Sequence, residues 1–143
     1  MAESLMKYFE PKREIVPTII WIWGESGSGK TRWVYENYTE VFRPVSHKWW
    51  EGYDGHKTVL IDDIRADWCT WREILTLLDV YPLKVECKGG SRQLLAETII
   101  LTCDRPPEGV WCNSEDVNQL HRRISEIREL HRITQKSGGN TSP

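Results

Sequence analysis

The chain has 143 residues, the length of one domain and enough to bury a hydrophobic core. Its formal net charge of −2 excludes a protein that binds nucleic acid through an overall basic surface, so such binding would need a local patch or loop. No apolar run is as long as a membrane span, the amino terminus lacks a secretory-signal pattern, and the four cysteines form no CxxC pair and predict reduced thiols in a cytosolic or nuclear protein.

Three segments are expected along the chain. Residues 1–16 are polar and mixed, and an apolar set there fits one face of a short helix that would dock on the domain, pack on a neighbouring subunit or end a linker. Residues 17–134 alternate between strand-like and helix-like patterns, as expected of one α/β domain with a mostly parallel sheet. Residues 135–143 have the composition of a disordered tail.

The domain begins with an apolar strand, residues 18–23, that runs into a glycine-rich loop and a helix predicted from Gly29 to about Asn37. This order is that of a phosphate-binding P-loop. Its backbone N–H groups would surround the phosphates, Lys30 would reach the β- and γ-phosphates, and Thr31 would hold Mg²⁺. A glycine-rich turn without a ligand is the alternative, but it leaves the Lys-Thr pair unexplained. The predicted nucleotide-binding residues are Gly24, Glu25, Ser26, Gly27, Ser28, Gly29, Lys30 and Thr31.

A second strand, residues 58–62, ends in Asp62 and Asp63, after a short strand predicted at residues 44–48. A buried strand that ends in two acids is a Walker B pattern, and in a parallel sheet these acids would lie beside the P-loop. Asp62 would then hold Mg²⁺ with Thr31, and Asp63 would position or deprotonate the attacking water. The alternative is a solvated acidic pair at a strand end.

The next elements are a helix predicted at residues 71–80, with Thr70 as its N-cap, and a short extended segment at residues 84–86. The loop at residues 88–92 contains two glycines and is locally basic, which suits either a loop that grips phosphate or a solvated turn.

A third apolar strand, residues 98–102, is followed by Asp104, which is a candidate sensor of the γ-phosphate or simply part of an Asp-Arg-Pro-Pro turn. A long helix is predicted at residues 114–133, with acids in its first turn and arginines later. Arg122 and Arg123 on this helix either reach a neighbouring subunit's γ-phosphate as an arginine finger or belong to a charged helix face.

Together these segments resemble the helicase domain of replication-associated proteins from circovirus-like single-stranded DNA viruses, which are superfamily 3 helicases with an AAA+-type core. The resemblance is carried by the P-loop and by two further segments. Residues 48–56 read Lys-Trp-Trp-Glu-Gly-Tyr-Asp-Gly-His, and residues 81–90 read Tyr-Pro-Leu-Lys-Val-Glu-Cys-Lys-Gly-Gly. It implies a P-loop NTPase fold of AAA+ type, with helices on both faces of the sheet.

The resemblance also implies a function. ATP is the expected substrate, Mg²⁺ its cofactor, and the partners are other copies of the chain in a hexameric ring and single-stranded DNA, with RNA not excluded. Lys88, Gly89 and Gly90 fall on the loop that lines the pore of such rings and contacts phosphates, and Arg122 or Arg123 supplies the arginine finger. The resemblance places the protein in the host cell nucleus.

Two departures from the family are expected. The family usually has Asn where Asp104 stands, and because an ionised Asp only accepts hydrogen bonds, Arg105 is a candidate to share the sensor role. The family's upstream nickase domain has no room before the P-loop, so no nicking activity is expected of this chain. Two other functions stay open: a nucleotide-binding oligomerisation module with weak ATPase activity, and a P-loop phosphotransferase.

Overall fold

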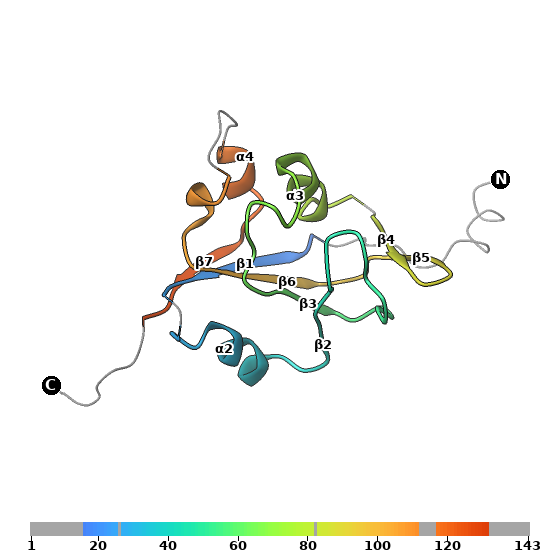
Figure 1. Cartoon of the computed structure of the whole chain (residues 1–143), viewed down its shortest axis with the longest axis horizontal. Coiled ribbons are helices and arrows are strands. Elements are labelled where there is room, and N and C mark those ends of the chain that lie inside the picture. Colours follow the sequence, from blue (N-terminus) through green and yellow to red (C-terminus); the bar gives the residue numbers. More distant parts are fainter. Residues whose placement is uncertain (1–15, 26, 82, 112–116, 132–143) are drawn as a thin grey trace, which may run out of the picture.

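Five parallel strands form the central sheet (Figure 1). The structure is a computed structural model that describes residues 16–25, 27–81, 83–111 and 117–131. The sheet has the order β2-β3-β6-β1-β7. Its strands are β1 (Thr18–Trp23), β2 (Val41–Phe42), β3 (Thr58–Ile61), β6 (Thr98–Cys103) and β7 (Glu126–Glu129).

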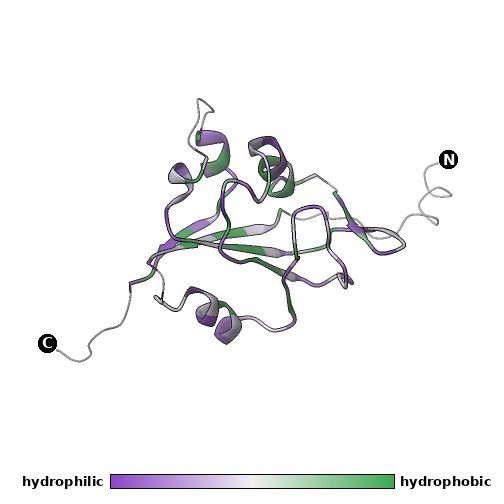
Figure 2. Ribbon diagram, in the orientation of Figure 1, coloured by the Kyte–Doolittle hydropathy of each residue, from purple (hydrophilic) through white to green (hydrophobic). Residues whose placement is uncertain are grey.

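The three inner strands are apolar on both faces because both faces of the sheet are covered. Alternate residues of β1 enter two different cores: Trp21 packs in the larger core, whereas Ile20 and Ile22 pack in the smaller one. Figure 2 shows the hydrophobic residues along these strands. Full burial of each such side chain stabilises the folded state by roughly 1.5–3 kcal/mol. Because both faces are buried, each of these strands is a continuous apolar run in the sequence.

Helices cover both faces of the sheet, as predicted (Figure 1). The smaller core lies under α2 (Lys30–Asn37), through Val34. The larger core lies under α3 (Trp71–Leu77) and the short helix α4 (Asn118–His121). Thr70 caps α3 in a capping box with Glu73, as the sequence indicated for this N-cap. The predicted α/β fold is confirmed.

A separate antiparallel hairpin lies beyond the amino ends of β3 and β6, at the end of the sheet opposite the P-loop (Figure 1). It consists of β4 (Lys84–Cys87) and β5 (Gly90–Gln93), which pair from Lys84↔Gln93 to Cys87↔Gly90. A 3₁₀ turn, η1 (Pro107–Gly109), follows β6.

The predicted helix at residues 114–133 is wrong in its second half. Within the described residues α4 spans only Asn118–His121, and the chain then forms the parallel edge strand β7 beside β1. The Ser125 N–H donates to the Ile19 carbonyl at 2.8 Å, and the pairing continues from Ile20↔Glu126. All four β7 residues are exposed, so the strand has no alternating apolar pattern, and its backbone pairing with β1 outweighs helix propensity.

The strand predicted at residues 44–48 is also wrong. The strand in this region is β2, and residues 44–48 contribute only an isolated bridge between Ser46 and Trp49. Pro44 lacks an N–H for a sheet ladder, so pairing with β3 ends just before it.

Several predictions fall partly or wholly outside the described residues: the short helix before residue 16, Ser26 of the P-loop, the start of the long helix and the tail. Cys69, Cys87 and Cys103 are free thiols, as predicted, and burial raises the pKa of Cys69 to about 12. None of the helices in the described ranges is long and apolar enough to cross a bilayer.

Candidate ATP-hydrolysis site

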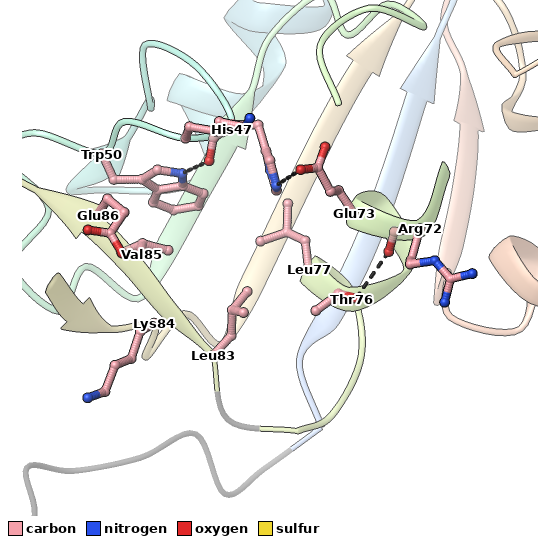
Figure 3. Close-up of a pocket in the computed structure, with 11 residues that line it drawn as sticks. His47, Trp50, Arg72, Glu73, Thr76, Leu77, Leu83, Lys84, Val85 and Glu86 are labelled. Atoms are coloured by element: carbon pink, nitrogen blue, oxygen red, sulfur yellow. Dashed lines mark hydrogen bonds and ion pairs between the residues drawn. The ribbon is translucent and has the colours of Figure 1, made fainter. Parts of the chain in front are cut away.

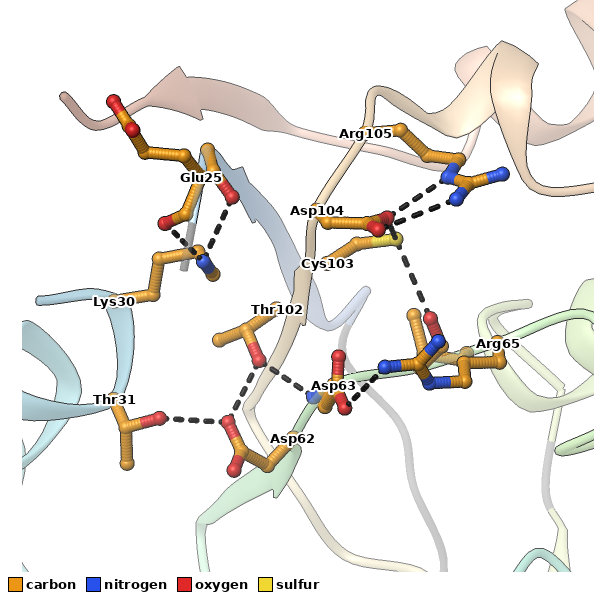
Figure 4. Close-up of polar contacts among 12 residues, drawn as sticks. Glu25, Lys30, Thr31, Asp62, Asp63, Arg65, Thr102, Cys103, Asp104 and Arg105 are labelled. Atoms are coloured by element: carbon orange, nitrogen blue, oxygen red, sulfur yellow. Dashed lines mark hydrogen bonds and ion pairs between the residues drawn. The ribbon is translucent and has the colours of Figure 1, made fainter. Parts of the chain in front are cut away.

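The carboxyl ends of β1, β3 and β6 bring the P-loop and the acidic residues to one edge of the sheet (Figure 4). A cavity of about 460 Å³ opens there. Its walls come from the P-loop, α2 and the segments that follow β3 and β6: Gly27, Gly29, Lys30, Thr31, Arg32, Asp62, Asp63, Arg65, Thr102 and Asp104. The sheet topology therefore assembles residues that are far apart in the sequence into one polar site.

The P-loop holds Lys30 by its own carbonyl groups. The Lys30 ammonium donates to the carbonyls of Gly24 at 2.8 Å and Glu25 at 3.0 Å, and it lies 3.5 Å from the Ser28 hydroxyl (Figure 4). Gly29 adopts φ +88° as the N-cap of α2, a conformation that favours glycine. Helix α2 begins at this cavity, so its first-turn N–H groups and the positive end of its dipole are suited to bind an anion there.

Asp62 is the centre of a compact oxygen cluster. Its Oδ1 accepts hydrogen bonds from the hydroxyls of Thr31 and Thr102, both at 2.7 Å. Its Oδ2 accepts from the Arg43 guanidinium at 3.0 Å. Hydroxyl and carboxylate oxygens are the ligands that Mg²⁺ prefers, so Thr31 and Asp62 fit the predicted magnesium site.

Asp63 is held apart from Asp62 by its backbone. It has φ +56°, a left-handed conformation that is uncommon for a residue other than glycine, and its N–H donates to the Thr102 hydroxyl at 2.7 Å. Its carboxylate pairs with Arg65 at 3.0 Å, and this contact raises the pKa of the Arg65 guanidinium. The two acids therefore have different partners although they are adjacent in the sequence.

Asp104 lines the cavity but is paired with Arg105, at 2.8 and 3.2 Å. The Arg105 guanidinium lowers the pKa of the Asp104 carboxyl, so this group is ionised near neutral pH and only accepts hydrogen bonds. Thr102, two residues earlier, is buried and contacts Asp62 and the Asp63 backbone.

Sequence reasoning missed three residues of this site: Arg43, Arg65 and Thr102. Thr102 had a usable signal, because it is a hydroxyl residue at the end of an apolar strand. Arg65 lies two residues after Asp63. The ion pair between them depends on the left-handed conformation of Asp63, which the sequence did not indicate. Arg43 had no sequence signal.

Arg122 and Arg123 are not among the residues that line this cavity within one chain. Arg123 is held by the Leu75 carbonyl at 3.1 Å, the Gln119 carbonyl at 2.8 Å and the Asp79 carboxylate at 2.9 Å. Arg122 is exposed, and its guanidinium donates a hydrogen bond at 3.3 Å to the Asn118 carbonyl in its own helix. The two arginines therefore differ in their freedom to reach another molecule.

Lys88, Gly89 and Gly90 lie at the tip of the β4–β5 hairpin, and this hairpin lies at the end of the sheet opposite the P-loop (Figure 1). All three are exposed, and Gly89 has φ +83°. The hairpin begins after Leu83, and after β5 the chain leads directly into β6, whose carboxyl end carries Thr102.

Comparison with known proteins shows the family of this chain. A family model described as RNA helicase matches residues 20–104, more than half of the chain, from β1 through the end of β6. The chain belongs to the RNA helicase family. The match includes the P-loop, Asp62, Asp63 and Thr102, and it ends before α4 and β7.

The chain is also similar to replication-associated proteins of circoviruses, which confirms the resemblance. It is 37% identical to that of goose circovirus over 118 residues, covering 82% of this chain and 40% of the relative. It is 36% identical to that of porcine circovirus 2 over 132 residues, covering 88% of this chain and 41% of the relative. The chain thus spans about two fifths of the length of these relatives and corresponds to their helicase domain.

Proposed function

We propose that this helicase domain hydrolyses ATP between the subunits of a ring and uses the energy to move along single-stranded DNA during viral rolling-circle replication. The observation that carries the proposal is the cluster in which Asp62 joins Thr31 and Thr102 beside Lys30. Membership of the RNA helicase family supports it, as do relatives named replication-associated proteins.

In the proposed mechanism, Lys30 exchanges its P-loop carbonyls for the β- and γ-phosphates, and the N–H groups at the start of α2 bind the same phosphates. Thr31 and Asp62 would hold Mg²⁺, which when bound would neutralise charge on the phosphate oxygens. Asp63 orients the attacking water and accepts its proton, and Thr102 keeps both acids in place.

The remaining positive charge comes from a neighbouring subunit. We assign this role to Arg122, because Arg123 already satisfies its guanidinium with two carbonyls and a carboxylate. An arginine that approaches the γ-phosphate from another subunit stabilises transition-state charge and makes hydrolysis depend on assembly. The proposed assembly is a homo-oligomer, a hexameric ring.

Lys88 and the glycines beside it are proposed to contact the phosphates of one strand, DNA or RNA, inside the ring. The contacts are to phosphates, so binding should depend weakly on base sequence and strongly on salt. In a full-length protein we propose an upstream nickase domain, and action in the host cell nucleus.

The proposal is tested by measuring ATP hydrolysis with and without single-stranded DNA, together with duplex unwinding. Hydrolysis that rises with DNA and drives unwinding is expected. Unstimulated hydrolysis without unwinding would support a nucleotide-binding oligomerisation module instead, and ATP-dependent phosphorylation of a small acceptor would support a phosphotransferase.

A further inference from the structure

One carboxylate holds the tip of the β4–β5 hairpin from outside the hairpin. The Glu51 Oε1 atom accepts a hydrogen bond from the backbone N–H of Lys88 at 2.7 Å, across 37 positions in the sequence. Glu51 is exposed and lies in the segment that leads to β3, the strand that carries Asp62. An ionised acceptor strengthens such a bond.

The φ angles of the two turn residues in this hairpin match the twist of its strands poorly, so the turn depends on contacts from outside. Cys87 pairs with Gly90, so Lys88 and Gly89 are the two turn residues. Of these two turn residues only Gly89 has a positive φ, whereas the turns whose twist matches a two-residue hairpin need a positive φ at the first turn residue. This turn therefore fits the strand twist poorly, and the Glu51 bond acts on its first residue.

The same segment contacts the hairpin at further points. The Trp50 N–H donates to the Glu86 carbonyl at 2.8 Å, the Cys87 thiol donates to the Trp50 carbonyl at 3.3 Å, and Arg92 pairs with the Asp54 carboxylate at 3.4 Å. These contacts hold both hairpin strands, and Glu51 alone among them reaches a residue of the turn.

The hairpin also borders a cavity of about 380 Å³ between β4 and α3, which His47, Lys48 and Trp50 from the segment before Glu51 line as well (Figure 3). Val85 and Lys84 line it from the hairpin, and Thr76 and Leu77 line it from α3. Val85 of the hairpin and Leu77 of α3 belong to the same buried core, so β4 is packed on the domain, whereas the turn is held by the Glu51 carboxylate.

We propose that Glu51 is a positioning residue, which fixes the turn so that the Lys88 ammonium and the glycine backbone meet a phosphate together. This inference rests on the proposed nucleic-acid role of Lys88. The inference predicts an effect on nucleic-acid binding that is opposite to the effect of charge alone. Removing an acid near a phosphate-binding loop should by itself strengthen binding, whereas removing this acceptor should weaken it.

Glu51→Gln and Glu51→Ala separate these two effects, because both remove the charge but only Gln keeps a side-chain acceptor. Glu86→Ala is the matched control, since it removes an exposed acid from the same hairpin and keeps the Glu86 backbone carbonyl that accepts from Trp50. The measurements are affinity for single-stranded DNA at several salt concentrations and hydrogen exchange at the Lys88 amide.

In Glu51→Ala we expect weaker DNA binding and exchange at the Lys88 amide faster by about tenfold or more, as loss of a charge-assisted bond implies. Glu51→Gln and Glu86→Ala should bind DNA as well as wild type or better. If Glu51→Ala does not fold, Glu51→Asp, one methylene too short to reach the turn, provides the same test.

Unchanged Lys88 exchange in Glu51→Ala, or equal DNA binding by the Ala and Gln variants, would overturn the positioning role. Failure of the underlying function looks different. If Lys88→Ala leaves DNA affinity and its salt dependence unchanged while Glu51→Ala speeds exchange, the bond is real but the hairpin does not bind nucleic acid.

Discussion

At the scale of single residues, the hydroxyl of Thr102 connects the two acids of the site. It donates to the Asp62 carboxylate and accepts from the Asp63 N–H, both at 2.7 Å. In the proposed mechanism Asp62 holds Mg²⁺, and loss of a residue that orients a metal ligand typically lowers activity about 10–100-fold. Thr102 therefore fits the end of this strand better as a functional residue than Asp104, which is paired with Arg105.

Thr102→Val keeps the shape of the side chain and removes its hydroxyl. We expect ATP hydrolysis to fall about 10–100-fold. The unfolding free energy should fall by about 1–3 kcal/mol, because the Asp63 N–H loses its acceptor. Thr102→Ser, which keeps the hydroxyl, is the control and should retain most activity in a steady-state ATPase assay. Wild-type hydrolysis by the Val variant would remove Thr102 from the site.

Arg122 and Arg123 should behave differently when each is changed to Ala. Arg123→Ala breaks the contact with Asp79 and two carbonyl bonds, so we expect it to lower the unfolding free energy by about 1–3 kcal/mol in chemical denaturation. Arg122→Ala should change that free energy by less than about 0.5 kcal/mol and should reduce hydrolysis by the assembled protein by about 10³-fold or more. The reverse pattern would exchange the two roles.

At the scale of elements, Gly24 joins the P-loop to the sheet edge. A Cβ at this position would lie 2.1 Å from the Leu130 carbonyl oxygen, just after β7. The Leu130 N–H donates to the Trp23 carbonyl at 2.9 Å, which fixes that close approach. Glycine is therefore required here by packing as well as by phosphate binding.

Gly24→Ala should displace the end of β7 from β1 and lower the thermal midpoint by several degrees, since even about 1 kcal/mol corresponds to roughly 2–8 °C for domains of this size range. Gly109→Ala is the control: its Cβ would meet the flexible Arg105 side chain, at 3.3 Å. The measurement is thermal unfolding followed by circular dichroism. Equal midpoints for Gly24→Ala and wild type would show that the chain relaxes around the new methyl group.

The inner elements could be predicted because burial leaves a pattern in the sequence. Residues 18–23 and 98–102 are continuous apolar runs, and Thr70 with Glu73 is a local capping signal. The edge strand β7 could not, because its side chains are all exposed and only backbone pairing with β1 defines it. Within the site, the P-loop residues could be predicted from their local sequence. The partners of Arg43 and Arg123 could not, because they depend on tertiary packing.

At the scale of the whole molecule, the proposed site needs two subunits, so two different inactive variants should complement each other in a mixed assembly. Lys30→Ala would lack the phosphate-facing charge, and Arg122→Ala would lack the charge donated to a neighbour. In a mixed ring, an Arg122→Ala subunit keeps its own Lys30 and receives Arg122 from a Lys30→Ala neighbour. Mixing the two proteins should therefore restore part of the ATPase activity, and no recovery at concentrations where mixed rings form would argue against a shared site.

Two strands connect the proposed site with the hairpin at the other end of the sheet. Strands β3 and β6 carry Asp62 and Thr102 at their carboxyl ends, and the segments before them hold the hairpin with Lys88. We expect a change in the contacts of Asp62 and Thr102 during the proposed hydrolysis to be transmitted along these strands to the hairpin. We expect nucleic acid at the hairpin to alter hydrolysis at the opposite edge.

The most direct test is the rate of ATP hydrolysis with and without single-stranded DNA for wild type, Lys30→Ala, Lys88→Ala and the control Lys57→Ala, whose exposed lysine lies outside the cavity. We expect DNA to stimulate wild type and Lys57→Ala, Lys30→Ala to show no hydrolysis, and Lys88→Ala to lose the stimulation. Near-normal hydrolysis by Lys30→Ala would contradict the site, and full stimulation of Lys88→Ala would contradict its link to the hairpin.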